Sequence, residues 1–150
     1  MIQPLKDRTH FQSKALTRCY TRFQSLIDEL RKRTLSDTTV SFINERIEVI
    51  NRNHDEKELK KLVRKAQYAI IKKLQKDHKI VPKGYYTTMW MALGMSAFGI
   101  PMGAAFGAAT DNMGLLGIGI PIGMSLGIAI GAQKDAQAAK NGLQLRFKNS

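Results

Sequence analysis

The sequence predicts an all-α integral membrane protein, with a basic three-helix N-terminal region, an antiparallel hairpin of two membrane-spanning helices and a helical C-terminal tail. Two observations predict this class. All 12 glycines lie at or after Gly84, whereas 20 of the 24 Lys and Arg residues lie within residues 1–83. Between Lys83 and Lys134 there is one charged residue, Asp111. The expected basic region, membrane hairpin and tail cover residues 1–83, 84–132 and 133–150.

The charge of residues 1–83 is strongly unbalanced. Their 20 basic and 10 acidic residues leave a net +10, out of +12 for the whole chain. Such asymmetry indicates contact with a membrane or with nucleic acid. Met1–Arg18 lacks the apolar core of an export signal, so this region is expected to stay in the compartment where it is made. The single cysteine, Cys19, excludes a disulfide framework within the chain and is expected to be a buried thiol.

Apolar side chains at helical spacing predict three helices within residues 1–83. The first covers about Pro4–Lys32, the second follows a cap at Ser36 or Asp37, and the third runs over about Asp55–Lys79. The expected core-facing residues are Phe11, Ala15, Cys19, Phe23, Leu26 and Leu30 in the first helix, Val40, Ile43, Ile47 and Ile50 in the second, and Leu59, Leu62, Ala66, Ala69, Ile70 and Leu74 in the third.

Two apolar runs follow, over about residues 85–109 and 113–132. A helix needs roughly 20 apolar residues to cross the hydrocarbon core of a bilayer, and backbone groups in lipid must be bonded within the segment. Both runs are therefore predicted to be membrane-spanning helices, joined by the short polar tip Thr110–Asn112. Aromatic rings that prefer the headgroup layer mark the start of the first span at Tyr85, Tyr86 and Trp90.

The charges that flank the hairpin predict its orientation. Lysines and arginines stand on both outer sides, while the tip carries only Asp111. The positive-inside bias then places both termini in the cytoplasm and the tip outside, with the hairpin in the inner (cytoplasmic) membrane of the cell. The second helix is expected to continue into the tail and to pack on the N-terminal region through Ala132, Ala136, Ala139, Leu143 and Phe147.

Small residues recur every fourth position in both predicted spans. Residues four apart share one face of a helix, and small faces let helices approach closely in lipid. The segment Gly99–Gly107 also repeats, twenty residues later, as Gly119–Gly127, with matching prolines that predict two matched bends. Because small residues occupy more than one face of the second helix, we expect these glycines to mediate homo-oligomer formation. The packing residues are Gly99, Gly103, Gly107, Gly119, Gly123, Gly127 and Gly131.

This hairpin resembles the bacterial glycine-zipper two-helix membrane proteins over about residues 85–143. The resemblance rests on the Gly-xxx-Gly runs, the polar tip and the exit Gly131–Asp135. It implies tight helix packing in a membrane. Glycine-zipper segments occur both in membrane-permeabilising toxins and in anchors, so the resemblance leaves the biological role open.

No catalytic motif is apparent. The three histidines, His10, His54 and His78, are far apart without metal-ligand spacing, and the glycines do not form a phosphate-binding loop. No serine or cysteine stands in a recognisable nucleophile motif. We therefore expect a non-enzymatic protein with no metal and no cofactor.

A basic face is expected on the third helix. Its residues are Lys57, Lys60, Lys61, Arg64, Lys65, Lys72, Lys73 and Lys76. Three interpretations stay open: a solvated face that also signals topology, a surface attracted to anionic lipid headgroups, and a binding site for nucleic acid or an acidic protein.

Two functions fit these expectations. In the first, the glycine faces assemble an oligomeric pore or membrane-perturbing effector controlled by the basic domain, with Asp111 and Asn112 at the outer mouth. In the second, the hairpin is a membrane anchor or scaffold, and the basic helices recruit a protein, nucleic acid or anionic lipid, for example as an accessory factor of a defence system.

Overall fold

A computed structural model describes residues 1–8, 11–112, 114 and 116–145. The described chain is mostly helical and has five helices, when the continuous helical run over residues 85–110 is counted once. It divides into two compact units, one of Met1–Lys83 with Leu145 and one of Gly84–Gln144. The predictions that concern His10, Met113 and the tail residues Arg146, Phe147 and Lys148 lie outside the described residues.

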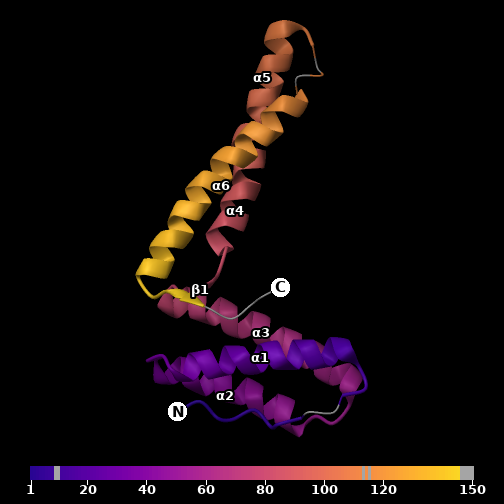
Figure 1. Ribbon diagram of the computed structural model, residues 1–150, viewed down its shortest axis with the longest axis vertical. Helices are drawn as coiled ribbons and strands as arrows, with labels where there is room; N and C mark the ends of the chain where they lie inside the picture. The colour runs from indigo at the N-terminus through magenta and orange to yellow at the C-terminus, as the bar shows by residue number, and fades with distance from the viewer. Residues whose placement is uncertain (9–10, 113, 115, 146–150) are drawn as a thin grey trace. The chain divides into compact units, whose positions relative to one another are not determined.

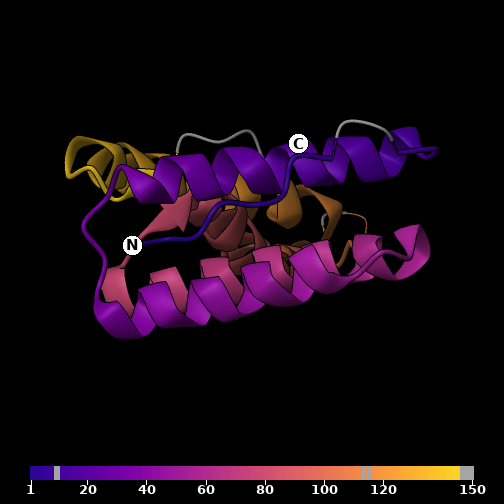
Figure 2. The same cartoon turned by 90° about the horizontal axis from the view of Figure 1, so that it is seen from below.

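Three helices bury one apolar core in the first unit. They are α1 (Lys14–Arg31), α2 (Asp37–Arg52) and α3 (Glu56–His78), and they lie alongside one another (Figures 1 and 2). Each contributes a stripe with three- and four-residue spacing, as amphipathic helices do. The fully covered core residues include Leu16, Phe23, Leu26, Ile27 and Leu30 of α1, Ile43, Ile47 and Ile50 of α2, and Leu59, Val63, Ile70 and Leu74 of α3.

The predicted stripe of α1 is wrong in part. Ala15 is exposed and Cys19 is half-buried, whereas Leu16, Tyr20 and Ile27 are buried. The predicted stripe counts helical steps from Phe11, but Phe11 precedes the helix, which begins at Lys14. The other two helices differ from the prediction at fewer positions. Val40, Leu62 and Ala69 are half-buried rather than buried, and Thr39 and Val63 are buried although they were not among the predicted core residues.

The first helix begins at Lys14, so the predicted helix from Pro4 is also wrong. The N-terminal chain instead runs along the unit between α1 and α2 (Figure 2). Its backbone bonds go to two asparagine side chains on α2: Asn44 Oδ1 accepts the Gln3 N–H at 2.8 Å, and Asn51 Oδ1 accepts the Lys6 N–H at 2.9 Å. These asparagines supply partners that a helix would have found within itself.

A tyrosine fixes the same segment from α1. The Tyr20 hydroxyl donates a hydrogen bond of 2.6 Å to the Lys6 carbonyl oxygen, and its ring packs on Phe11 with centroids 5.1 Å apart. Burial raises the pKa of Tyr20 above the ordinary 10.0, partly offset by the nearby Arg8 charge, so the phenol keeps its donor proton.

The second unit is a helical hairpin (Figure 1). Its first arm is one continuous helical run made of α4 (Tyr85–Leu93), the π-helical segment η1 (Gly94–Gly99) and α5 (Ile100–Thr110). Its second arm is α6 (Leu116–Lys140), which passes residue 132 without a break. The expected stripe Ala132, Ala136 and Ala139 is exposed; Gly131, Asp135 and Ala138 are buried instead, one position earlier.

Among the described residues, the helix Tyr85–Thr110 is long and apolar enough to cross a membrane by length and composition. The mean hydropathy of its 18-residue window is 1.4, and only 22% of that window is buried within the chain.

The all-α expectation missed a short two-stranded sheet. Its strands are β1 (Val81–Pro82) and β2 (Gln144–Leu145), in which Val81 and Leu145 are buried.

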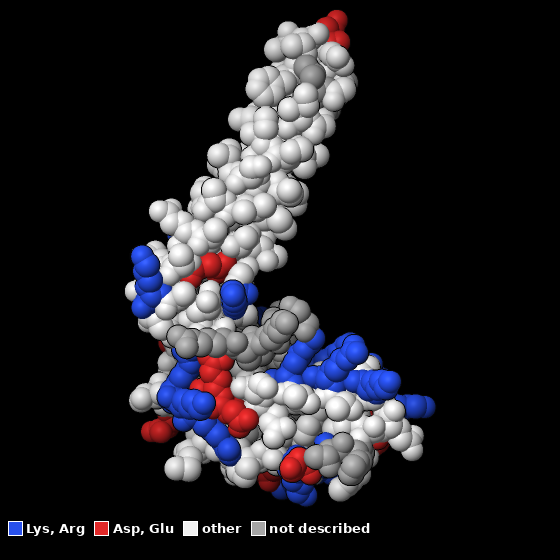
Figure 3. Space-filling model, viewed as in Figure 1, with Lys and Arg blue, Asp and Glu red and all other residues white. Residues whose placement is uncertain are grey.

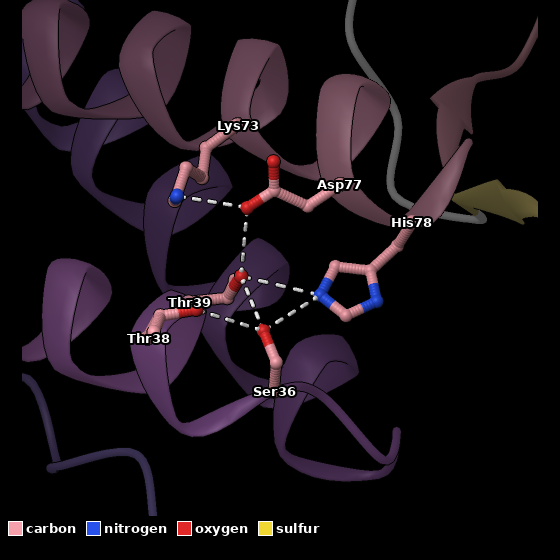
Figure 4. A network of polar contacts seen from close by, with 6 residues as sticks. All are labelled: Ser36, Thr38, Thr39, Lys73, Asp77 and His78. Carbon is pink, nitrogen blue, oxygen red and sulfur yellow. Dashed lines mark hydrogen bonds and ion pairs between the residues drawn. The ribbon is translucent and has the colours of Figure 1, made fainter.

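A polar network joins the start of α2 to the end of α3 (Figure 4). The buried hydroxyl of Thr39 donates a hydrogen bond of 3.4 Å to Asp77 Oδ2 and lies 3.2 Å from His78 Nε2. The Ser36 hydroxyl lies 3.4 Å from the same nitrogen, and Lys73 pairs with Asp77 at 2.8 Å. Because Asp77 contacts a hydroxyl rather than the imidazole, the group acts as a tie between two helices rather than as a nucleophile and its base.

The carboxylate in this tie makes stability depend on pH. The hydrogen bond from the Lys73 ammonium, helped by its charge and by Thr39, outweighs partial desolvation and lowers the pKa of Asp77 below the ordinary 3.8. A folded-state pKa below the unfolded one contributes stability that is present above the unfolded value and is lost as the pH falls through the folded value.

We therefore expect Asp77→Asn to lower the melting temperature of the first unit at neutral pH, with the difference from the parent chain shrinking in acid. Circular dichroism melts over an acid series measure this. Asp28→Asn, at an exposed position of α1, is the matched control and should melt like the parent. A deficit of Asp77→Asn that stays constant into strong acid would contradict the role assigned to the charge.

Candidate functional site

The two arms of the hairpin meet through glycine backbones. A Cβ atom placed on Gly123 would lie 2.7 Å from the Cα of Gly99 and closer still to the carbonyl oxygen of Gly94. One placed on Gly131 would lie 2.5 Å from the Cα of Thr87. Side-chain carbons do not approach backbone atoms this closely, so only glycine fits at these positions without moving the helices apart.

The contacts run in opposite order along the two arms, so the arms are antiparallel. Every fourth residue of α6 faces the first arm, and the faces are buried on both sides. Gly107, on the first arm, is buried as well. Along α6 the contacts are Gly119 with Gly99 and Gly103, Gly123 with Gly94 and Gly99, Gly127 with Trp90 and Met91, and Gly131 with Tyr86 and Thr87.

The π-helical segment keeps the first arm in register. Gly94 and Gly99 are five residues apart, and five residues of α-helix rotate the chain about 140° beyond a full turn. A π-helix has more residues per turn, so η1 returns both glycines to the face that meets α6. Pro101 follows and has no N–H to donate to the preceding turn. In the other arm, α6 continues as α-helix through Pro121, and the expectation of two matched bends stays a prediction.

A carboxylate closes the base of the hairpin. Asp135 is 8% exposed and follows Gly131 by four residues on the same face of α6. Its oxygens accept the Tyr86 N–H at 3.1 Å, the Thr87 N–H at 2.9 Å and the Thr87 hydroxyl at 2.7 Å. The first N–H groups of a helix have no partner within it, and they favour a negative charge. Asp135 therefore caps the N-terminus of α4 from the opposite arm.

Aromatic residues surround this cap. The Lys134 ammonium lies 5.5 Å from the centroid of the Trp90 ring, and Tyr85 and Tyr86 pack edge to face with centroids 5.3 Å apart. The Trp90 main chain also touches Gly127. Trp90 is the only tryptophan of the chain, so its fluorescence reports on hairpin closure.

The residues predicted at a pore mouth form the tip of the hairpin. Asp111 ends α5 in the left-handed conformation, with φ 54°, and its N–H donates to the carbonyl oxygen of Gly107. The Asn112 N–H donates to the same oxygen at 3.0 Å, and Asn112 Oδ1 accepts the Gly114 N–H. Both side chains are exposed. Their contacts cap the helix, and a role at a pore mouth stays a prediction.

The structure separates the predicted basic residues of α3 into two groups. Lys60 and Lys73 are half-buried at the edges of the helix, and Lys73 pairs with Asp77. The remaining six are exposed on the side opposite the core: Lys57, Lys61, Arg64, Lys65, Lys72 and Lys76.

Sequence reasoning missed the cap at Asp135 and the network around His78. The signal for Asp135 was present, since it continues the four-residue spacing of the α6 glycines. The network had no such signal, because it joins residues about forty apart in the chain. No family model, curated protein or solved structure matches this chain.

The glycine contacts predict that substitution at a contact glycine opens the hairpin, whereas substitution at an exposed glycine does not. Gly123→Leu should open the hairpin, because overpacking a closed contact costs about 1–3 kcal/mol or more. Gly117 lies on the same helix, and no atom of the described residues comes within 4 Å of a Cβ placed there, so Gly117→Leu is the matched control. Trp90 fluorescence during titration of the detergent-solubilised protein with SDS measures opening. Equal midpoints for the two variants would contradict the contact.

The cap predicts local protection. Replacing Asp135 by Asn removes a charge-assisted pair of hydrogen bonds, which is worth about 1–3 kcal/mol. Amide exchange at Tyr86 and Thr87 should therefore accelerate roughly tenfold to a hundredfold. Asp111→Asn, at the exposed tip, should leave these two amides unchanged. Parent-like exchange in Asp135→Asn would show that the cap carries no stability.

Proposed function

We propose that this chain is a bacterial inner-membrane protein in which the Gly84–Gln144 unit is a closed two-span anchor and the basic Met1–Lys83 unit is a cytoplasmic scaffold for an anionic partner. One observation carries the proposal: the glycines where the two arms meet are buried within the chain, while nine large apolar side chains of the hairpin are exposed.

The apolar surface of the hairpin supports a lipid environment. Nine of the twelve exposed large apolar residues in the described chain belong to this unit. A core helix of a water-soluble protein would be mostly covered, whereas only 22% of the apolar window in Tyr85–Thr110 is buried. Soluble monomers rarely expose so much contiguous apolar surface. Figure 3 shows this surface without charge between the acidic tip and the base.

The glycine contacts support an anchor that is complete within one chain. Helices in lipid associate by close packing rather than by hydrophobic burial. Six of the seven glycines expected to join several copies already contact the opposite arm of the same chain: Gly99, Gly103, Gly119, Gly123, Gly127 and Gly131. A single copy therefore covers this glycine face without a second chain.

The distribution of charge supports the orientation. The first unit carries 20 of the 24 basic residues, and the tip carries only Asp111. Under the positive-inside bias, the basic unit stays in the cytoplasm and the tip faces the outside of the inner membrane.

A homo-oligomeric pore or membrane-perturbing effector is the second candidate. The observation that favours it is a set of small residues that stay exposed, Gly117 on α6 and Ala105 and Ala109 on α5. Against it, the closest glycine contacts are already made within the chain, and the hairpin between its ends has no ionisable residue except Asp111 to line a path. The anchor is therefore the better-supported function.

The test combines topology with permeability. In a Cys19→Ser background, Asp111→Cys should react with an impermeant maleimide added outside spheroplasts, and Thr21→Cys should react only after lysis. The protein should resist alkaline extraction, and liposomes that contain it should retain a trapped dye. Extraction by alkali would refute the anchor, and dye release that Gly117→Leu abolishes would favour the pore instead.

A further inference from the structure

One side of α3 carries an exposed row of cations around an exposed aromatic ring. The row winds along the side opposite the buried stripe of Leu59, Val63, Ala66, Ile70 and Leu74. Figure 3 shows lysine and arginine side chains gathered over α3. We call this surface the α3 outer face; it consists of Lys57, Lys61, Arg64, Lys65, Tyr68, Lys72 and Lys76.

Among the described residues, the basic side chains of this face form no ion pair. The acids of α3 are Glu56 and Glu58 in its first turn and Asp77 in its last, where Lys73 pairs with Asp77. Like charges four residues apart repel one another and weaken a helix, and 57/61, 61/65 and 72/76 are such pairs. In α2, by contrast, both arginines pair with a glutamate, Arg46 with Glu45 and Arg52 with Glu48. A cluster of cations without such pairing fits an anionic surface.

The centre of the face suits a lipid headgroup layer. Tyr68 is 70% exposed between Arg64 and Lys72. Tyrosine is favoured at membrane interfaces, where its ring and hydroxyl meet apolar and wet surroundings at once. Single-stranded nucleic acid is bound by several stacking aromatic rings, and α3 offers one.

The chain itself limits how far this face can be from a bilayer, and this step rests on the proposed function. Only the six residues 79–84 separate the end of α3 from Tyr85, the first residue of the proposed span. Such a connection reaches about 25 Å at full extension. Lys79 and Lys83 lie within it and add to the positive charge near the headgroups.

We propose that the α3 outer face lies on the anionic headgroups of the bilayer that the hairpin enters. Anionic lipid would then hold the first unit against the cytoplasmic surface, leaving the α1 side free for other contacts. High salt should release it, because screening weakens attraction between exposed charges.

The experiment uses the full chain in lipid nanodiscs. A nitroxide is placed at Tyr68→Cys in a Cys19→Ser background, and its accessibility to a water-soluble nickel relaxant is measured. Discs of phosphatidylcholine alone are compared with discs that also contain phosphatidylglycerol. Accessibility should fall several-fold in the anionic discs and recover in high salt, whereas a nitroxide at Thr21→Cys on α1 should stay exposed in both.

Matched variants separate this face from general basicity. Changing Lys61, Arg64 and Lys72 to Gln should abolish the protection, and changing the exposed Lys14, Arg18 and Lys32 to Gln should preserve it. Both sets remove two lysines and one arginine. Equal loss in both sets would overturn the assignment of this face.

Three other outcomes of this experiment also test the inference. Equal accessibility of position 68 in both kinds of disc would overturn the inference while leaving the anchor intact. Protection by an RNA oligonucleotide, with none from anionic lipid, would overturn it in favour of nucleic acid. A chain that does not enter discs at all would refute the membrane anchor, and the inference with it.

Discussion

The structure depends most on the close approach of two helix backbones at the glycine face of the hairpin. At Gly123 the opposite backbone occupies the space of a Cβ atom, and the same holds at Gly119, Gly127 and Gly131. Other features follow from keeping this face continuous. The η1 segment restores the phase of Gly94, and Asp135 lies on the same face, where it meets the free N–H groups of α4. The large side chains of the hairpin whose burial is described are exposed or half-buried, and none of them is fully buried.

The first unit is held together in a different way. Its helices bury ordinary branched and aromatic side chains, such as Phe23, Ile47 and Ile70, against one another. Polar side chains position the segments outside this core. Asn44 and Asn51 bind the N-terminal chain, and the network at Thr39 joins the start of α2 to the end of α3. The charge of the unit contributes little to this core, and six of its 20 basic residues lie on the exposed side of α3.

The sequence predicted helices better than it predicted their partners. Four-residue glycine spacing correctly indicated a close helix contact, but spacing alone does not say whether the other helix belongs to the same chain. The sequence did not indicate the role of Gly94. In an ideal α-helix Gly94 would not lie on the same face as Gly99, and only the π-helical segment brings both to the face that meets α6. The helix expected from Pro4 was wrong because the bonds that compete with it come from Asn44 and Asn51, more than forty residues away.

The most direct test asks whether the glycine contacts lie within one chain. Chains labelled with carbon-13 at glycine would be reconstituted in lipid, alone and diluted with an excess of unlabelled chains, and solid-state NMR would record the cross-peak between Gly99 and Gly123. If the contacts lie within one chain, the cross-peak intensity per labelled chain stays the same at every dilution. Intensity that falls in proportion to dilution would show that the contacts join different chains, and would contradict a hairpin closed within one chain.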